Sequence, residues 1–201
     1  MSEGVAEGAA EGVPEDPWLD HDELAAWVRL VAVVELLPGV LDTQLRQDAE
    51  LTHFDYYVLA MLSEAPQRTL QMTDLARTTN ATLPRLSHVV RRLEQRGLVQ
   101  RSTCPGDRRA TNAALTEQGW AVVRQAAPGH AATVRRSIFD ALEPEQVRQL
   151  DAIGAAILSR LDPHGSMKGT YDRYGRAAET GAADPRPAET QPAESHPEET
   201  P

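Results

Sequence analysis

The sequence predicts an all-α fold, or α+β by a strict count, in which helices surround one small β-hairpin. Two short amphipathic segments follow one another between residues 70 and 95, and two strand-like segments flank a charged turn between residues 98 and 115. Long apolar stripes with helical spacing lie on both sides of this region. Two helices, a strand, a turn, a second strand and a new helix follow in the order of a winged helix-turn-helix.

The two central helices are recognised by their ends. The first opens at Leu70 and stops by Thr79-Asn80, and Thr82 can cap the second, where Pro84 is tolerated in the first turn because its missing N–H would be unpaired there. One face of the second helix carries apolar residues at steps of three and four, namely Leu83, Leu86, Val90 and Leu93. The opposite face carries Arg85, Ser87, His88, Arg91, Arg92 and Gln95.

A hairpin is predicted after the second helix. Gly97 ends that helix because glycine tolerates positive φ, and residues 98–101 lead into a segment at 103–109 that contains Pro105-Gly106 and is expected to be a turn or loop tip. Residues 110–115 return as a short strand, and Thr116 then suits the cap of another helix.

These residues resemble the multiple antibiotic resistance regulator (MarR) family of winged-helix transcription factors. The family's pattern of Leu-Glu, two residues, Gly-Leu-Val, one residue and Arg matches residues 93–101. The wing signature Asp107-Arg108-Arg109 and the exit Leu115-Thr116-Glu117-Gln118-Gly119 follow. The resemblance extends from Leu24 to Leu161 and leaves both ends of the chain unmatched.

The resemblance implies a DNA-binding surface. A basic helix face alone is more often solvated surface, but a tight helix pair followed by a basic hairpin offers one element to a major groove and one to the adjacent minor groove. In the family the second helix enters the major groove and a wing arginine reaches the minor groove, with Asp107 expected to orient Arg109, although Asp107 also fits an ordinary turn. The implied DNA-binding residues are Thr82, Arg85, Ser87, His88, Arg91, Arg92, Asp107, Arg108 and Arg109.

The resemblance also implies an effector cleft between the dimer base and the DNA-binding lobe. Polar tips beside apolar bodies, as in His53 and Tyr57, can fix a small aromatic or phenolic molecule. The same side chains fit an ordinary core equally well, and for Phe54 the core is preferred. The expected effector-binding residues are Trp27, Leu30, His53, Tyr57 and Met61.

Charge and composition predict the domain boundaries. The first 23 residues contain eight acidic residues and no lysine or arginine, and residues 163–201 contain seven acidic and four basic groups. Within residues 68–109, nine arginines face three carboxylates, although the whole chain carries −10. We therefore expect a domain at 21–162, with a DNA-binding lobe at 50–119 and dimerisation helices at 21–49 and 120–162, between disordered tails at 1–20 and 163–201.

The flanking helices are predicted from their apolar stripes. The first begins with Asp22 as cap and should bend or divide at Pro38-Gly39, whereas the next, from Leu51 to Ser63, has Thr52 as cap. After the wing, a long stripe from Trp120 to Leu142 is expected to kink without stopping at Pro128-Gly129, and a last helix starts at Pro144. The stripes on the first and last two helices exceed what one chain can bury, which favours a homodimer.

The sequence contains no catalytic or metal-binding pattern. There is no nucleophile elbow, phosphate loop or pair of catalytic carboxylates, and Glu94 is expected to pair with Arg91 or Arg101. The six histidines lack metal-ligand spacing, so neither a metal nor another cofactor is expected. Cys104, the single cysteine, excludes an intramolecular disulfide and is interpreted as an ordinary wing residue rather than a redox sensor.

Localisation is expected to be cytoplasmic. No uninterrupted apolar run reaches the roughly 20 residues needed to span a bilayer, and the N-terminus is acidic where a secretory signal would be basic. The predicted function is that of a homodimeric regulator that binds double-stranded DNA at a pseudo-palindromic operator, more often as a repressor than as an activator, and is released by a small-molecule effector. The alternative is a dimeric helical module that binds a ligand or a protein and has lost DNA binding; the local positive charge and the wing arginines favour the regulator.

Overall fold

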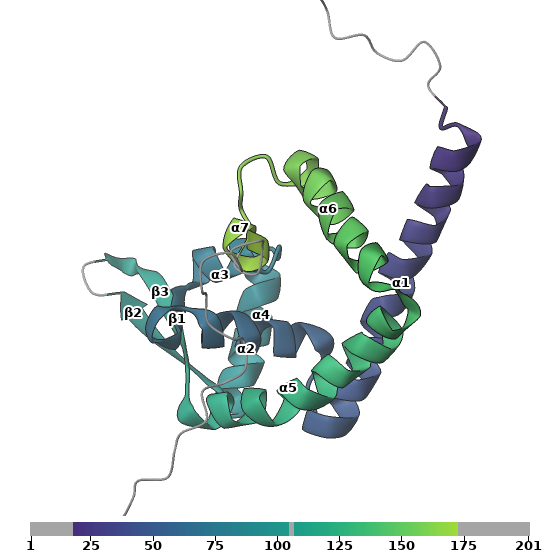
Figure 1. The fold of residues 1–201 in the computed structure, drawn as a ribbon. Coiled ribbons are helices and arrows are strands. Elements are labelled where there is room, and N and C mark those ends of the chain that lie inside the picture. Colours follow the sequence, from purple (N-terminus) through teal and green to yellow (C-terminus); the bar gives the residue numbers. More distant parts are fainter. Residues whose placement is uncertain (1–17, 105–106, 173–201) are drawn as a thin grey trace, which may run out of the picture. The chain divides into compact units, whose positions relative to one another are not determined.

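A computed structural model of the protein describes residues 18–104 and 107–172 (Figure 1). The predicted acidic N-terminal tail falls outside the described residues except for Trp18 to Asp20, and the predicted C-terminal tail does so beyond Asp172. The chain divides into two compact units, one ending at Val40 and the other beginning at Leu41.

The first helix, α1 (His21–Ala49), crosses the division between the units. Asp20 caps it, because the Glu23 amide donates to Asp20 Oδ1 over 2.8 Å and the Asp20 amide donates to Glu23 Oε2 over 3.0 Å. The prediction of Asp22 as cap was therefore wrong by two residues. The helix also runs through Pro38, so a division into two helical segments was wrong: a proline removes one backbone hydrogen bond, and the leucines and valines around it keep the helix.

The helix α1 is long and apolar enough to cross a membrane by length and composition alone. No uninterrupted apolar run of this length occurs in the sequence, so the prediction of no such segment was wrong for the interrupted stretch. Arg29 and Glu35 are the only charged residues between Leu24 and Leu41, so the interrupted stretch still meets the criterion. A helix that packs against another copy of the chain has the same composition, and this feature is weak support for a membrane span.

Three helices form the centre of the larger unit: α2 (His53–Glu64), α3 (Met72–Thr78) and α4 (Leu83–Gln95). Thr52 caps α2 in a reciprocal arrangement with Asp55, as the sequence predicted for Thr52. A 3-10 turn, η1 (Pro66–Arg68), separates α2 from the first strand. Buried side chains from these helices make the core, with Leu59, Leu62, Leu75, Leu86, Val90 and Leu93 fully enclosed.

Two expected core residues lie nearer the surface. Leu83 is 44% exposed, and Val89 is buried in its place at 6% exposure. Leu83 is the first residue of α4 and lies at the end of the helix, outside the part that packs against the core. Phe54 is half-buried and packs against the core without being enclosed by it.

The three strands form one antiparallel sheet in the order β1-β3-β2. They are β1 (Thr69–Gln71), β2 (Val99–Cys104) and β3 (Asp107–Leu115), and Ala113 at the centre of β3 pairs with Leu70 on one side and Arg101 on the other. Figure 1 shows the β2–β3 hairpin extending away from the helices. β2 and β3 remain paired as far as Cys104 and Asp107. The prediction of a turn over the whole of 103–109 was therefore wrong.

The C-terminal half begins with α5 (Glu117–Ser137), capped by Thr116 as predicted. Pro128 lies inside α5 and does not end it, but the helix stops at Ser137 and the expected stripe continues only into a 3-10 turn, η2 (Phe139–Ala141). The helix α6 (Pro144–Leu161) starts with Pro144, again as predicted.

A short helix that was not predicted, α7 (Lys168–Tyr171), follows α6. The carboxylate of Asp162 fixes its approach, because it accepts hydrogen bonds from the Ser166 and Met167 amides at 2.6 and 2.8 Å and from the Tyr171 hydroxyl at 3.1 Å. These three bonds hold the pKa of the Asp162 carboxyl below its ordinary value. The net effect is a lowered pKa because the amide of Met167 contributes most, whereas burial acts in the opposite direction.

Gly119 allows the hairpin to contact α5 closely. A Cβ atom at this position would lie 2.1 Å from the carbonyl oxygen of Leu98 and 2.7 Å from Leu115 Cδ1. The same Leu98 carbonyl accepts a hydrogen bond from the amide of Thr116, the cap of α5. Movement of this carbonyl would break that hydrogen bond. This close approach explains why the exit sequence ends in glycine.

Replacement of Gly119 by alanine should therefore destabilise the fold. We expect Gly119→Ala to lower the free energy of unfolding by about 3 kcal/mol or more, because the obstacle is backbone that cannot rotate away. Gly169→Ala in α7 is the matched control, since this glycine is exposed and a Cβ there meets nothing within 4 Å. Urea unfolding followed by circular dichroism compares the two; equal midpoints would contradict the close contact.

Candidate nucleic-acid interface

The start of α4 is fixed by its own sequence. Thr82 caps the helix, and its hydroxyl accepts a hydrogen bond from the Arg85 amide over 3.4 Å. Arg85 is thereby the third residue of the helix, and the N-terminal residues of such a helix are those that contact base edges in helix-turn-helix proteins. Thr82 and Arg85 are both exposed.

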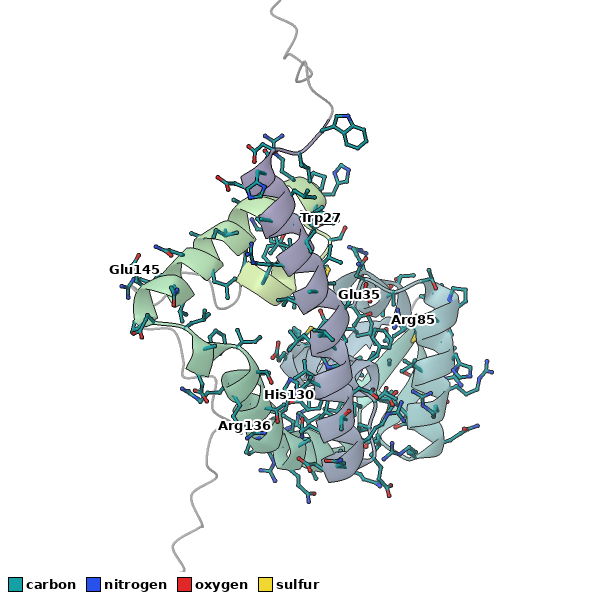
Figure 2. The ribbon with its side chains drawn as sticks, turned by 90° about the vertical axis from the view of Figure 1, so that its right-hand side faces the viewer. Trp27, Glu35, Arg85, His130, Arg136 and Glu145 are labelled. Carbon is teal, nitrogen blue, oxygen red and sulfur yellow. The ribbon has the colours of Figure 1, made fainter. Side chains whose placement is uncertain are left out.

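The guanidinium of Arg85 lies over an aromatic ring. Its Cζ atom is 4.2 Å from the centroid of the Phe54 ring on α2 (Figure 2 labels Arg85). A cation over a ring face within about 6 Å is attracted by the ring's quadrupole. The sequence placed Phe54 in the core and gave it no part in the DNA interface.

Beyond Arg85, the outward face of α4 carries the exposed side chains of His88 and Arg91. His88 and Arg91 are exposed, and neither side chain has a hydrogen-bond or ion-pair partner among residues 18–104 and 110–172. Ser87 is half-buried and lines a hollow between α3, α4 and the hairpin together with Gln71, Thr73, Arg101 and Thr111. These residues belong to the surface predicted to bind DNA, and their contacts with DNA stay a prediction.

Arg92 has a different environment from the other arginines of this face. Its guanidinium pairs with the carboxylate of Asp55 on α2, which is only 2% exposed, whereas 42% of the Arg92 side chain is exposed. Asp55 also accepts a hydrogen bond from the Thr52 amide over 3.0 Å. Arg92 therefore compensates a buried charge, a structural role that the sequence analysis did not give it.

Two more arginines of the basic region, Arg96 and Arg101, have partners within the fold. Arg96 donates to the carbonyl oxygens of Glu50 at 2.8 Å and Ala49 at 3.4 Å, at the end of α1, where the helix dipole favours a cation. Arg101 binds Glu94 through its side chain at 2.6 Å and its amide at 3.1 Å, so of the two partners expected for Glu94 the structure shows Arg101. These bonds lower the pKa of the Glu94 carboxyl.

Arg68 is held at the other end of the sheet. Its guanidinium lies 4.5 Å from the centroid of a Trp120 ring and donates to Glu117 over 2.9 Å. Most of the described arginines between residues 68 and 104 thus serve the fold. The charge that faces outward on α4 is concentrated at Arg85 and Arg91, with the His88 side chain beside them.

The wing residues lie at the start of β3. Asp107 pairs with Cys104 in the β2–β3 register, and the side chains of Asp107, Arg108 and Arg109 are outside the description, so their expected contacts stay predictions. The Cys104 thiol donates to Asn112 Oδ1 over 2.9 Å, which gives it a partner within the hairpin.

The expected effector residues separate into two groups. Trp27 and Leu30 belong to the N-terminal unit and are 54% and 43% exposed. His53, Tyr57 and Met61 share one side of α2 at a spacing of four residues, with three different neighbours. His53 stacks on His130 of α5 at 6.1 Å between centroids, the Tyr57 hydroxyl donates to the Thr78 carbonyl at 3.2 Å, and Met61 Sδ accepts from the Thr170 hydroxyl at 3.6 Å.

The histidine pair contains unsatisfied polar atoms. Nδ1 of His53 and Nδ1 of His130 are buried without a hydrogen-bond partner, as is Oε1 of Gln44 on α1 (Figure 2 labels His130). Burial lowers the pKa of both histidines, an effect that Asp42 opposes at His53 and that His53 reinforces at His130. Tyr56 packs on His130 at 4.6 Å between ring centroids.

His130 and Asp55 were the residues that sequence reasoning missed. A carboxylate three residues after Thr52 is the pattern of a helix cap, which could have identified Asp55 as a capping residue but not as the partner of Arg92, 37 positions away. His130 had no sequence signal, because its relation to His53 depends on how α5 crosses α2.

A helix pair, an exposed cationic helix face and an adjoining three-stranded sheet with a projecting hairpin define a winged-helix DNA-binding protein. Residues 50–110 match the model of the MarR family. Sco3205, a MarR family transcriptional regulator from Streptomyces coelicolor whose structure is a complex with DNA, is 42% identical over 73% of this chain and 96% of its own, with a TM-score of 0.70.

Two other solved structures extend the comparison. AbsC, a MarR family transcriptional regulator from Streptomyces coelicolor, is 39% identical over 74% of this chain and 100% of its own, with a TM-score of 0.69. CouR from Rhodococcus jostii RHA1, bound to p-coumaroyl-CoA, is 25% identical over 67% of this chain and 90% of its own, with a TM-score of 0.57. The chain belongs to the MarR family and is a DNA-binding transcriptional regulator. Family members are transcription regulators rather than enzymes.

The adjacent arginines Arg91 and Arg92 should respond differently to replacement. Arg92→Ala leaves the buried Asp55 charge without its partner, so we expect the free energy of unfolding to fall by about 1 to 3 kcal/mol. Arg91→Ala removes an exposed side chain and should stay within about 0.5 kcal/mol of the parent. Denaturant titration of the two variants checks this difference, and equal stabilities would show that the Asp55 pair contributes nothing.

The histidine pair should make stability depend on pH. Burial holds the pKa of both histidines below the ordinary 6.5, so the unfolded chain binds more protons than the folded chain as pH falls through that value. Their effect is absent above pH 6.5 and destabilises the fold progressively below it, whereas the lowered carboxyl pKa values of Glu94 and Asp42 matter only below their ordinary 4.5 and 3.8. We expect a lower Tm at pH 5.5 than at pH 7.5, and a smaller difference in the His53→Gln, His130→Gln double variant. The same difference in both proteins would assign the effect elsewhere.

Proposed function

We propose that the protein is a homodimeric repressor that binds a pseudo-palindromic operator in the cytoplasm and is released by a small aromatic or phenolic effector. The observation that carries the proposal is that the basic side chains of α4 fall into two sets. Arg85, His88 and Arg91 are exposed, whereas Arg92 and Arg96, at the end of the helix, bind groups within the fold. The 42% identical relative Sco3205 was solved in complex with DNA, which supports the same use of this surface.

Exposed apolar side chains support the homodimer. On α6, Leu150, Ile153, Ile157 and Leu161 are between 39% and 76% exposed, although their spacing is that of a helix face built to be buried. The N-terminal unit carries a second exposed set on α1, with Leu24, Trp27, Val28, Val33, Val34 and Leu36 at 50% or more. A second copy of the chain would cover such stripes symmetrically.

The unsatisfied atoms beside α2 support an effector site. A ligand with a hydroxyl or amide group could satisfy Nδ1 of His53 or His130 and the oxygen of Gln44, and the ring of Tyr56 offers an aromatic face. The 25% identical CouR was solved with p-coumaroyl-CoA, which carries a phenolic group. Tyr57 and Met61 complete this side of α2, where the ligand would meet Thr170 of α7.

The DNA-binding surface is tested with an operator selected from random duplex DNA. If Arg85 and His88 contact base edges, each alanine variant should cost about 1 to 3 kcal/mol and relax discrimination at particular bases. Arg109→Ala should weaken binding with little change in major-groove preference, because the minor groove has a degenerate pattern, and Asp107→Ala should be a milder version of it. Footprints should show inverted half-sites about one helical turn apart.

Parent-like binding by all four variants would contradict the assignment of this surface to DNA. If the parent itself selected no sequence, the helical ligand- or protein-binding module would become the better description. Light scattering at micromolar concentration separately tests the assembly, with a mass of twice the 22.0 kDa chain expected. A mass equal to that of one chain would contradict the dimer.

A further inference from the structure

We propose that Phe54 is a positioning residue for DNA recognition: its ring holds the guanidinium of Arg85 and thereby sets the preference of α4 for guanine at one position of each half-site. This inference rests on the proposed DNA-binding surface and adds a residue outside the helix pair to it. The juxtaposition that carries it is the 4.2 Å separation between Arg85 Cζ and the Phe54 ring centroid.

The Phe54 ring is a firm support. Phe54 is the second residue of α2, and its half-buried side chain packs against the hydrophobic core. The start of α2 is fixed on both sides of Phe54, because the Asp55 amide donates to the Thr52 hydroxyl at 3.0 Å and the Thr52 amide donates back to Asp55 at 3.0 Å. The ring is therefore held in place by the core, and contact with it limits the conformations of the exposed Arg85 side chain.

Contact with a ring face leaves an arginine able to read a base. The attraction uses the flat face of the guanidinium, whereas its N–H donors point outward in the plane of the group. A free arginine loses side-chain entropy when it forms two hydrogen bonds at once. An arginine already restricted by a ring loses less, so the contact favours the geometry that pairs with guanine O6 and N7.

The contact is separable from the placement of α4 itself. Two turns further along the helix, Arg92 binds the buried Asp55, and Arg96 donates to carbonyl groups at the end of α1. The first bond holds α4 against α2 and the second holds it against the end of α1, and neither involves Phe54. Loss of the Phe54 ring should therefore change one arginine and leave the rest of the interface in position.

The test compares the dissociation constants of the full-length chain for its selected operator and for operators with single base pairs changed. We expect Phe54→Leu to lose about two- to fivefold of the discrimination at the guanine that Arg85 reads, the range given by an exposed cation–ring contact. Discrimination at other positions should be unchanged. Phe54→Tyr keeps the ring and should retain the parent's preference.

Double variants separate positioning from a general loss of structure. Phe54→Leu combined with Arg85→Ala should discriminate no worse than Arg85→Ala alone, because the ring acts only through this arginine. Phe54→Leu combined with Arg91→Ala is the matched control, since Arg91 lies on the same helix without an aromatic neighbour in the described chain, and these two effects should multiply. Thermal melting of each variant verifies that it is folded.

The proposal is overturned if Phe54→Leu keeps the parent's discrimination at every position, or if it weakens all operators equally. Independent effects of Phe54→Leu and Arg85→Ala would overturn it as well. These outcomes leave the proposed function intact as long as the parent binds an operator and Arg85→Ala impairs that binding. Failure of the parent to select any sequence would instead remove the proposed function and this inference together.

Discussion

The buried carboxylate of Asp55 is the constraint on which the arrangement of the DNA-binding lobe depends. It caps α2 through the Thr52 amide and binds Arg92 of α4, so one charged group fixes the start of one helix and the orientation of another. Removal of a carboxylate from water costs several kcal/mol unless it is paired and hydrogen-bonded, and both conditions are met here. The outward face of α4 is set as a consequence.

The same corner of the molecule joins the two proposed sites. Along one turn and a half of α2, His53 and Tyr57 contact α5 and α3, whereas Phe54 and Asp55 contact the arginines of α4. A ligand that displaced His53 or Tyr57 would act on a helix whose neighbouring residues hold Arg85 and Arg92. Such a ligand would have a short physical connection to the proposed DNA surface, and coupling between two sites is typically about 1 to 3 kcal/mol.

Local chemistry explains which features were predictable from the sequence. Thr52, Thr82, Thr116 and Pro144 are helix starts whose signals lie within four residues, and all four were confirmed. The Asp22 cap was wrong because Asp20 offers the same carboxylate two residues earlier, and the break at Pro38 was wrong because propensity on both sides outweighs one lost hydrogen bond. Leu83 was misplaced because apolar spacing does not show where a helix first meets the core.

Contacts between segments far apart in the chain could not be predicted from the sequence. The basic region correctly predicted an exposed cationic face. The sequence does not show, however, which of the nine arginines in these 42 residues stabilise the fold and which are free to contact DNA. That separation depends on which side chains α2 and the end of α1 present to α4. His130 and α7 were missed for the same reason, since their partners lie far away in the chain.

The division of the arginines into structural and DNA-binding sets is the central claim, and the salt dependence of operator binding tests it most directly. The slope of the logarithm of the binding constant against the logarithm of salt concentration counts the phosphate contacts that cations neutralise. Arg91→Ala should reduce this slope by about one for each subunit, because an exposed arginine facing DNA is lost. Arg96→Ala, which removes an arginine bound to the end of α1, should leave the slope unchanged. An equal reduction in both variants would contradict the division.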